Sequence, residues 1–297
     1  MSALLANRVA IVTGAGRGLG RTHALALARS GARVVVNDLD AEAADEVCDE
    51  IGRLGGQASG NSANVQDLQA VEDMVAQALA RWGQVDILVN NAGILRDKTF
   101  AKIDLEDFRL VLDVHVMGSV NCTHAVWSHM KERAYGRVIL TTSSSGLYGN
   151  FGQSAYSAAK MALVGLMQTL ALEGSRYGIH VNCLAPSAAT QMTNTLLLKE
   201  DLLALEAERV SPAVVALASE RAPSKRIVLA GAGSFEQAHI TMTQGTYLPD
   251  PELRPERILE LWERIDDRTD EVVPSRGSEQ YQYEVARARE NTPRQVK

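Results

Sequence analysis

The 297-residue sequence contains few cysteines, few aromatic residues and no uninterrupted apolar run of membrane-spanning length. Its three cysteines, Cys48, Cys122 and Cys183, lie far apart, which argues against a disulfide scaffold or a zinc site and for reduced thiols. The N-terminus lacks a basic leader followed by a long apolar segment. We therefore expect no metal, no membrane insertion and a cytoplasmic location.

Positive charge is also scarce. The sequence has 30 Lys and Arg residues against 36 Asp and Glu residues, giving a net charge of −6, and its arginines are scattered. Because a nucleic-acid partner requires a basic stripe that contacts phosphates, we expect no such partner. Hydrophobic residues make up 46% of the chain, and its length suits one α/β domain with a buried core better than two full domains.

Short apolar segments alternate with segments of helical periodicity through the first three-quarters of the chain. This alternation predicts a Rossmann-type α/β fold, in which a doubly wound parallel sheet of about seven strands is covered by helices on both faces. Strands are expected at Val9–Thr13, Arg33–Asn37, Asp86–Val89, Arg137–Thr141, His180–Leu184 and Arg226–Ala230, with a weaker one near Gln57–Ala63. Helices are expected at Leu19–Ser30, Ala41–Leu54, Asp67–Trp82, Leu105–Lys131 and Ser154–Tyr177.

The composition changes after about Gly245. We expect a single Rossmann-type domain over residues 1–245 and a C-terminal extension over residues 246–297. The extension is rich in Glu, Arg, Gln and Pro, with one helix expected at Pro255–Asp266. It is either an arm packed on a neighbouring subunit or a partly disordered tail.

A glycine-rich segment, Thr13–Gly20, joins the first expected strand to the first expected helix. Glycines let the backbone approach a pyrophosphate, which amide groups at the helix N-terminus then hold. The second strand leads to Asp38, 20 positions after Gly18 (38 − 18), where an acidic side chain meets the adenosine ribose. Arg17 would favour NADP, but Asp38 would repel a 2′-phosphate, so we expect NAD. The alternative is an ordinary tight turn with a helix-capping aspartate.

Tyr156 and Lys160 are four residues apart near the start of an expected helix, so their side chains share one face. A tyrosine titrates near 10, and a neighbouring ammonium would lower its pKa and make it a usable acid and base. Ser143 follows the strand Arg137–Thr141, where its hydroxyl can hold a substrate oxygen. Taken singly, the Tyr–Lys pair could be a surface pair and the serine a turn residue.

Together these motifs resemble the short-chain dehydrogenase/reductase family over roughly residues 5–235. Thr13–Gly20 is similar to its TGxxxGxG loop, Asn90–Gly93 to its NNAG segment, and Ser143, Tyr156 and Lys160 to its Ser…YxxxK set. The resemblance implies that Tyr156 exchanges the proton, Ser143 orients the substrate oxygen, and Lys160 binds the nicotinamide ribose and lowers the pKa of the tyrosine. The cofactor-binding residues that it implies are Gly14, Arg17, Gly18, Leu19, Gly20, Asp38, Asn64, Val65, Asn91, Ala92, Gly93, Tyr156, Lys160, Pro186, Ala188 and Thr190.

One position departs from the family pattern. The fourth catalytic residue of the family is an asparagine that supports a water beside the lysine, and His115 stands there in this sequence. A ring nitrogen could hold a similar water, and a histidine titrates near neutral pH. The alternative is a histidine that is simply packed within its helix.

His115, with residues 37–39, 94–97, 147–153, 185–192 and 230–233, resembles one branch of the family in particular. That branch comprises (3R)-hydroxyacyl-CoA dehydrogenases, present as a domain of peroxisomal multifunctional enzyme type 2 and as stand-alone bacterial enzymes. The resemblance implies NAD as cofactor, an acyl-CoA substrate and a homodimer or homotetramer. Two alternatives stay open: a dehydrogenase of steroids or other small alcohols, and a non-catalytic NAD-binding sensor.

The segment Pro186–Leu205 occupies the position of the family's substrate lid. Pro186-Ser187 stands where the family usually has Pro-Gly, so the lid geometry is expected to differ. An apolar face in the segment suits a fatty acyl chain or a steroid, although leucines at helical spacing also suit a core or subunit contact. That face comprises Met192, Leu196, Leu197, Leu198, Leu202 and Leu203.

Overall fold

A computed structural model describes residues 3–188 and 203–291 of the chain. Contacts within the chain divide it into two units, residues 1–237 and residues 238–297. The first unit contains the sheet and all the expected site residues. The domain boundary at residue 245, expected from composition, stays a prediction.

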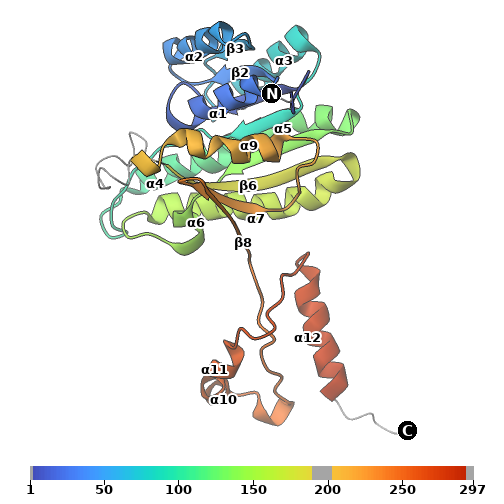
Figure 1. Ribbon diagram of the computed structural model, residues 1–297. Coiled ribbons are helices and arrows are strands. Elements are labelled where there is room, and N and C mark those ends of the chain that lie inside the picture. Colours follow the sequence, from blue (N-terminus) through green and yellow to red (C-terminus); the bar gives the residue numbers. More distant parts are fainter. Residues whose placement is uncertain (1–2, 189–202, 292–297) are drawn as a thin grey trace. The chain divides into compact units, whose positions relative to one another are not determined.

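The first unit is built on an eight-stranded sheet with the order β3-β2-β1-β4-β5-β6-β7-β8 (Figure 1). Neighbouring strands from β3 to β7 pair in parallel, which confirms the expected Rossmann-type, doubly wound fold. The strands are β1 (Val9–Thr13), β2 (Arg33–Asn37), β3 (Gln57–Asn61), β4 (Ile87–Asn90), β5 (Gly136–Thr141), β6 (Ile179–Ser187), β7 (Ile227–Gly231) and β8 (Ser234–Ala238).

The eighth strand is the main departure from the expected sheet. β8 lies at an edge and its residues are mostly exposed, so it carries no apolar run that the sequence could reveal. It follows β7 through Ala232 and Gly233, which both adopt left-handed backbone conformations, with φ of 51° and 82°. Such a turn is typical of a tight hairpin between adjacent strands.

Helices cover both faces of the sheet (Figure 1). On one side α1 packs against α2 and α9, and on the other α3 packs against α5 and α4 against α7. β1, β4 and β5 are buried along their whole length, because both of their faces are covered. The helices are α1 (Gly18–Arg29), α2 (Ala41–Arg53), α3 (Leu68–Trp82), α4 (Leu105–Leu112), α5 (Gly118–Glu132), α6 (Ser144–Tyr148), α7 (Ser154–Gly174) and α9 (Ser211–Ala218).

The expected helix over Leu105–Lys131 is interrupted. A π-helical turn, Asp113–Met117, separates α4 from α5 and contains His115. Single π-helical turns occur often at functional sites, because they shift a side chain out of the regular helical register. The sequence pattern gave no sign of this turn, nor of α6 and α9.

The helix α7 and the turn Ser175–Tyr177 that follows it match the expected helix Ser154–Tyr177. By length and composition alone this stretch could cross a membrane, a test that core helices of soluble proteins also pass. In this fold α7 packs against β6 and α4. Ala159, Leu163 and Met167 are among the residues that it buries.

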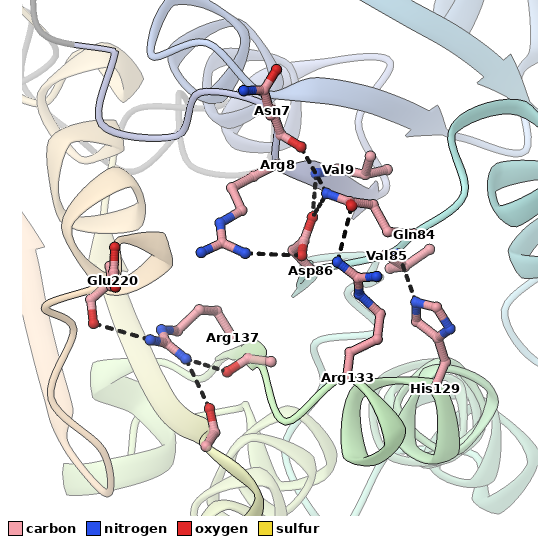
Figure 2. A network of polar contacts seen from close by, with 12 residues as sticks. Asn7, Arg8, Val9, Gln84, Val85, Asp86, His129, Arg133, Arg137 and Glu220 are labelled. Atoms are coloured by element: carbon pink, nitrogen blue, oxygen red, sulfur yellow. Dashed lines mark hydrogen bonds and ion pairs between the residues drawn. The ribbon is translucent and has the colours of Figure 1, made fainter.

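A polar network ties together the amino ends of β1, β4 and β5, the edge of the sheet opposite to the expected ligand site (Figure 2). The Asp86 carboxylate is 1% exposed and accepts hydrogen bonds from Arg8 at 3.2 Å and from the Val9 amide at 2.8 Å. Arg137, at the start of β5, donates to the carbonyl oxygens of Ser219 and Glu220 at 2.9 and 3.0 Å. These bonds attach the segment that follows α9 to the sheet.

The second unit contains α10 (Pro255–Glu260), α11 (Trp262–Ile265) and α12 (Ser278–Asn291). α10 and α11 fall within the helix expected at Pro255–Asp266, which is interrupted at Leu261. α12 was not expected from the sequence. Its Tyr283 hydroxyl donates to the Gln244 carbonyl oxygen at 2.8 Å, which joins the helix to the beginning of this unit.

Candidate active site

The glycine-rich loop leaves the start of α1 open to an anion. Gly14 and Gly18 have positive φ angles of 60° and 52°, which a side chain would strain. Aspartate side chains cap α2, α3 and α4, whereas α1 has no side-chain cap and no acidic residue in its first turn among the described residues. Its first amide groups therefore fit a pyrophosphate.

The segment after β4 fixes this loop in place. The Asn91 side-chain amide donates to the carbonyl oxygens of Thr13 and Gly14, both at 3.0 Å. In return the Thr13 hydroxyl oxygen accepts from the backbone amides of Asn91 and Ala92 at 3.0 and 3.1 Å. The structure thus places Asn91 and Ala92 beside the loop, at the point between β1 and β4 where the strand order reverses and ligands bind in such sheets.

Asp38 follows β2 and lies against the same loop. One carboxylate oxygen accepts from the Gly16 amide at 2.9 Å and the other from the Asp40 amide at 3.1 Å. Each carboxylate oxygen has two lone pairs, so both keep capacity to accept a ribose hydroxyl. The position and remaining acceptor capacity of Asp38 fit the adenosine ribose of a dinucleotide.

The other expected cofactor residues are distributed around this edge of the sheet. Leu19 packs against the core from α1. Val65, after β3, is buried, and its carbonyl oxygen accepts from Asn121 at 2.9 Å. Asn64 accepts from the Gln66 amide at 3.0 Å. Gly20 lies in the first turn of α1 and Gly93 follows β4, while Pro186 and Ala188 lie at and just after the end of β6.

Much of the expected lid falls outside the described residues. Thr190, Met192, Leu196, Leu197, Leu198 and Leu202 all belong to that part of the chain. Leu203 is described, and its side chain is 71% exposed.

Ser143, Tyr156 and Lys160 come together at the carboxyl end of β5. Ser143 caps α6 and is hydrogen-bonded to Tyr156, which lies in the first turn of α7. The Lys160 ammonium lies 5.5 Å from the centre of the Tyr156 ring and donates to the Thr141 carbonyl oxygen at 2.6 Å. The fold therefore gathers the three residues that the sequence singled out, with the end of β5 holding the lysine.

The pKa of Tyr156 is shifted in the direction opposite to the one that the Tyr–Lys spacing predicted. Burial raises the pKa of Tyr156 above its usual 10, and this outweighs the hydrogen bond with Ser143, which lowers it. Burial also lowers the pKa of Lys160 to about 7. A pKa raised above 10 favours the protonated form of Tyr156 near neutral pH.

His115 faces the same helix. Its ring meets the Tyr156 ring edge to face, with centroids 5.3 Å apart. Nε2 lies 3.0 Å from the amide nitrogen and 2.8 Å from the carbonyl oxygen of Ile94, whereas Nδ1 is buried without a partner among the described residues. Nε2 either accepts from the amide or donates to the carbonyl, so Nδ1 keeps unused hydrogen-bonding capacity in both tautomers.

The expectation that His115 titrates near neutral pH is wrong for this environment. Burial, followed by the charge of Lys160, lowers the pKa of His115 to about 3. The ring is therefore neutral at physiological pH. The close packing of the His115 ring also explains why residue 93 is a glycine, because a Cβ atom at that position would overlap the ring.

Two features of the site were not expected from the sequence. The Thr141 carbonyl that holds Lys160 is a backbone group, which no sequence motif can mark. Gln153 donates to Asp97 at 2.6 Å and accepts from the Ser145 hydroxyl at 2.8 Å. The bond to Asp97 joins segments 94–97 and 147–153.

In the described part of the chain, no cluster of His, Cys, Asp or Glu side chains could hold a metal ion.

This fold and site define the chain as a short-chain dehydrogenase. Residues 8–201 match the short chain dehydrogenase family, and the chain belongs to it. Members of this family are oxidoreductases that act on CH–OH groups with NAD or NADP, so the resemblance expected from the motifs is confirmed.

Among its relatives is the peroxisomal multifunctional enzyme type 2 of Mus musculus. The two are 43% identical over 279 residues, which cover 90% of this chain but only 38% of the mouse protein. A solved short chain dehydrogenase from Mycobacterium avium has a TM-score of 0.79 and 36% identity, covering 89% of this chain and 96% of that one. A 7α-hydroxysteroid dehydrogenase solved with NADH and 7-oxo glycochenodeoxycholic acid has a TM-score of 0.73 and 30% identity, covering 78% and 96%.

Proposed function

We propose that this protein is an NAD-dependent dehydrogenase that interconverts a secondary alcohol and a ketone, with a (3R)-3-hydroxyacyl-CoA as its substrate. The observation that carries the proposal is the convergence of Ser143, Tyr156 and Lys160 at the carboxyl edge of the sheet. Similarity to a peroxisomal multifunctional enzyme over 90% of the chain supports the acyl-CoA assignment.

In this mechanism the residues of the protein handle the proton. The glycine-rich loop and Asp38 would hold the dinucleotide, which would supply the hydride acceptor for oxidation of the alcohol and the hydride donor for reduction of the ketone. Ser143 donates a hydrogen bond to the substrate oxygen and supports its developing charge. Tyr156, whose raised pKa favours the phenol, gives its proton to the oxygen in reduction and must lose it to take up the hydroxyl proton in oxidation.

The substrate class can be tested in one NADH absorbance assay. We expect (3R)-hydroxyacyl-CoA to be oxidised at a higher kcat/KM than a hydroxysteroid or a simple secondary alcohol. Preference for the steroid would support the alternative that shares this chemistry with a different pocket. Failure to turn over any of these alcohols with either dinucleotide would favour a non-catalytic NAD-binding sensor.

A homo-oligomeric state and a cytoplasmic location stay predictions.

The cofactor preference should depend on Asp38. Asp38→Asn keeps an oxygen that can accept from the Gly16 amide but removes the charge that a 2′-phosphate would meet. We expect the ratio of kcat/KM for NAD over NADP to fall about tenfold, because an adjacent-charge repulsion of about 1–2 kcal/mol is relieved. Equal efficiency with both cofactors in the unmodified protein would contradict the NAD assignment.

We also propose that His115 takes the place of the family's asparagine by holding a proton-relay water at Nδ1. His115→Asn should keep activity within about tenfold, because an amide can bind both the Ile94 backbone and a water. His115→Leu should lose about 10²-fold in kcat, because a leucine offers no hydrogen bond.

The pH profile and stability separate this role from packing. A ring with a pKa of about 3 should add no inflection near pH 6.5, so the profiles of the unmodified protein and His115→Asn should match. If His115→Leu is active while His115→Asn is unstable and inactive, His115 is a packing residue and the relay is wrong.

A further inference from the structure

Arg17 and Asp40 form an ion pair beside the expected ribose site. Arg17 precedes Gly18 in the glycine-rich loop, and its side chain is 66% exposed. Its guanidinium donates to one carboxylate oxygen of Asp40. The other oxygen of Asp40 caps α2 by accepting from the Ala43 amide at 3.1 Å. One aspartate therefore both starts a helix and holds the arginine of the cofactor loop.

The orientation of Asp40 is fixed from a second direction. Its backbone amide donates to Asp38, whose other carboxylate oxygen binds the Gly16 amide of the loop. The next arginine along α1 is paired in the same way, since Arg21 contacts Glu50 of α2 at 2.5 Å. Gly16, Arg21 and Glu50 line a cavity between the loop and α2. Arg17 and Arg21 are thus each paired with a carboxylate, one from the cap of α2 and one from the helix itself.

We propose that Asp40 is a cofactor-specificity residue, which keeps Arg17 away from the 2′-phosphate of NADP(H). A guanidinium next to the adenosine ribose is the group that accommodates a 2′-phosphate. Here Asp40 engages that guanidinium in an ion pair. Preference for NAD then depends on two carboxylates. Asp38 faces the ribose, and Asp40 binds Arg17 so that the guanidinium does not contact a 2′-phosphate. This inference rests on the proposed dinucleotide-binding function.

The experiment is a calorimetric titration of NADPH, NADH and the fragment 2′,5′-ADP into the Asp40→Asn variant. Asparagine caps a helix about as well as aspartate, so α2 should keep its start while the ion pair is lost. We expect the dissociation constants of NADPH and 2′,5′-ADP to fall about fivefold, the scale of an exposed ion pair, and that of NADH to change less than about twofold.

Two comparisons make this test specific to Arg17. In the double variant Arg17→Gln/Asp40→Asn the gain in NADPH affinity should disappear relative to Arg17→Gln alone. Asp104→Asn makes the same chemical change at the cap of α4, where Asp104 accepts from the Glu106 amide at 2.9 Å, and should leave all three affinities unchanged. A gain that persists without Arg17, or that Asp104→Asn reproduces, would overturn the proposal.

Failure of this inference and failure of the proposed function give different results. If NADH binds the unmodified protein and Asp40→Asn leaves NADPH affinity unchanged, the role of Asp40 is wrong and the dinucleotide site stands. If the unmodified protein binds neither NADH nor NADPH, both proposals are wrong.

Discussion

Replacing Tyr156 with phenylalanine should lower kcat by about 10²–10⁴-fold, the range that general acid–base catalysis contributes. The change removes only the phenolic oxygen, which bonds Ser143 and which we propose exchanges the proton. The phenyl ring should keep its edge-to-face contact with His115, so the folded site should persist. Turnover is followed by NADH absorbance, and NADH binding by calorimetry should stay within about threefold, since no oxygen of Tyr156 is needed to hold the pyrophosphate.

A matched control is available just beyond the end of the same helix. Tyr177 ends the turn after α7, where it packs against the Lys131 ammonium at 4.8 Å, far along the helix from Tyr156. Tyr177→Phe makes the identical chemical change and should leave kcat unaltered. Substantial turnover by Tyr156→Phe would mean that another group moves the proton.

The second large effect is expected on stability, from Arg137→Met. Arg137 is 3% exposed and donates to four carbonyl oxygens, those of Gly136, Gly178, Ser219 and Glu220. Methionine fills much of the same volume but donates no hydrogen bond, so four backbone acceptors in buried or partly buried bonds lose this partner. We expect the free energy of unfolding to fall by about 3–5 kcal/mol, as for a buried charged group that is removed from its partners.

Chemical denaturation measures this loss, and Arg133→Met provides the comparison. Arg133 lies in the same network (Figure 2) but is exposed and donates at 3.0 Å to a single acceptor, the Gln84 side chain. Its replacement should cost about 0.5 kcal/mol or less, which is usual for an exposed contact. If Arg137→Met lowers the free energy of unfolding no more than Arg133→Met does, the network does not stabilise the sheet as inferred.

Local patterns determined much of the fold. β1 and β2 have the bounds that their apolar, β-branched residues predict, because a strand buried on both faces needs an uninterrupted apolar run. The loop Thr13–Gly20 and the Tyr156–Lys160 spacing are equally local, since each depends on a few neighbouring residues. The family and the chemistry of its site could therefore be predicted from the sequence.

Other features depend on contacts that no local pattern contains. The exposed edge strand β8 is stabilised by pairing with β7, and the π-helical turn around His115 has no signature in the helical periodicity. Burial raises the pKa of Tyr156, whereas the spacing to Lys160 predicted a lower pKa. Burial also lowers the pKa of His115, which residue type alone would place near neutral pH. The pairing of Arg17 with Asp40 joins a loop to a different helix. The sequence determined which groups are present, but only the tertiary structure decided their solvation and their partners, because both depend on residues far apart in the chain.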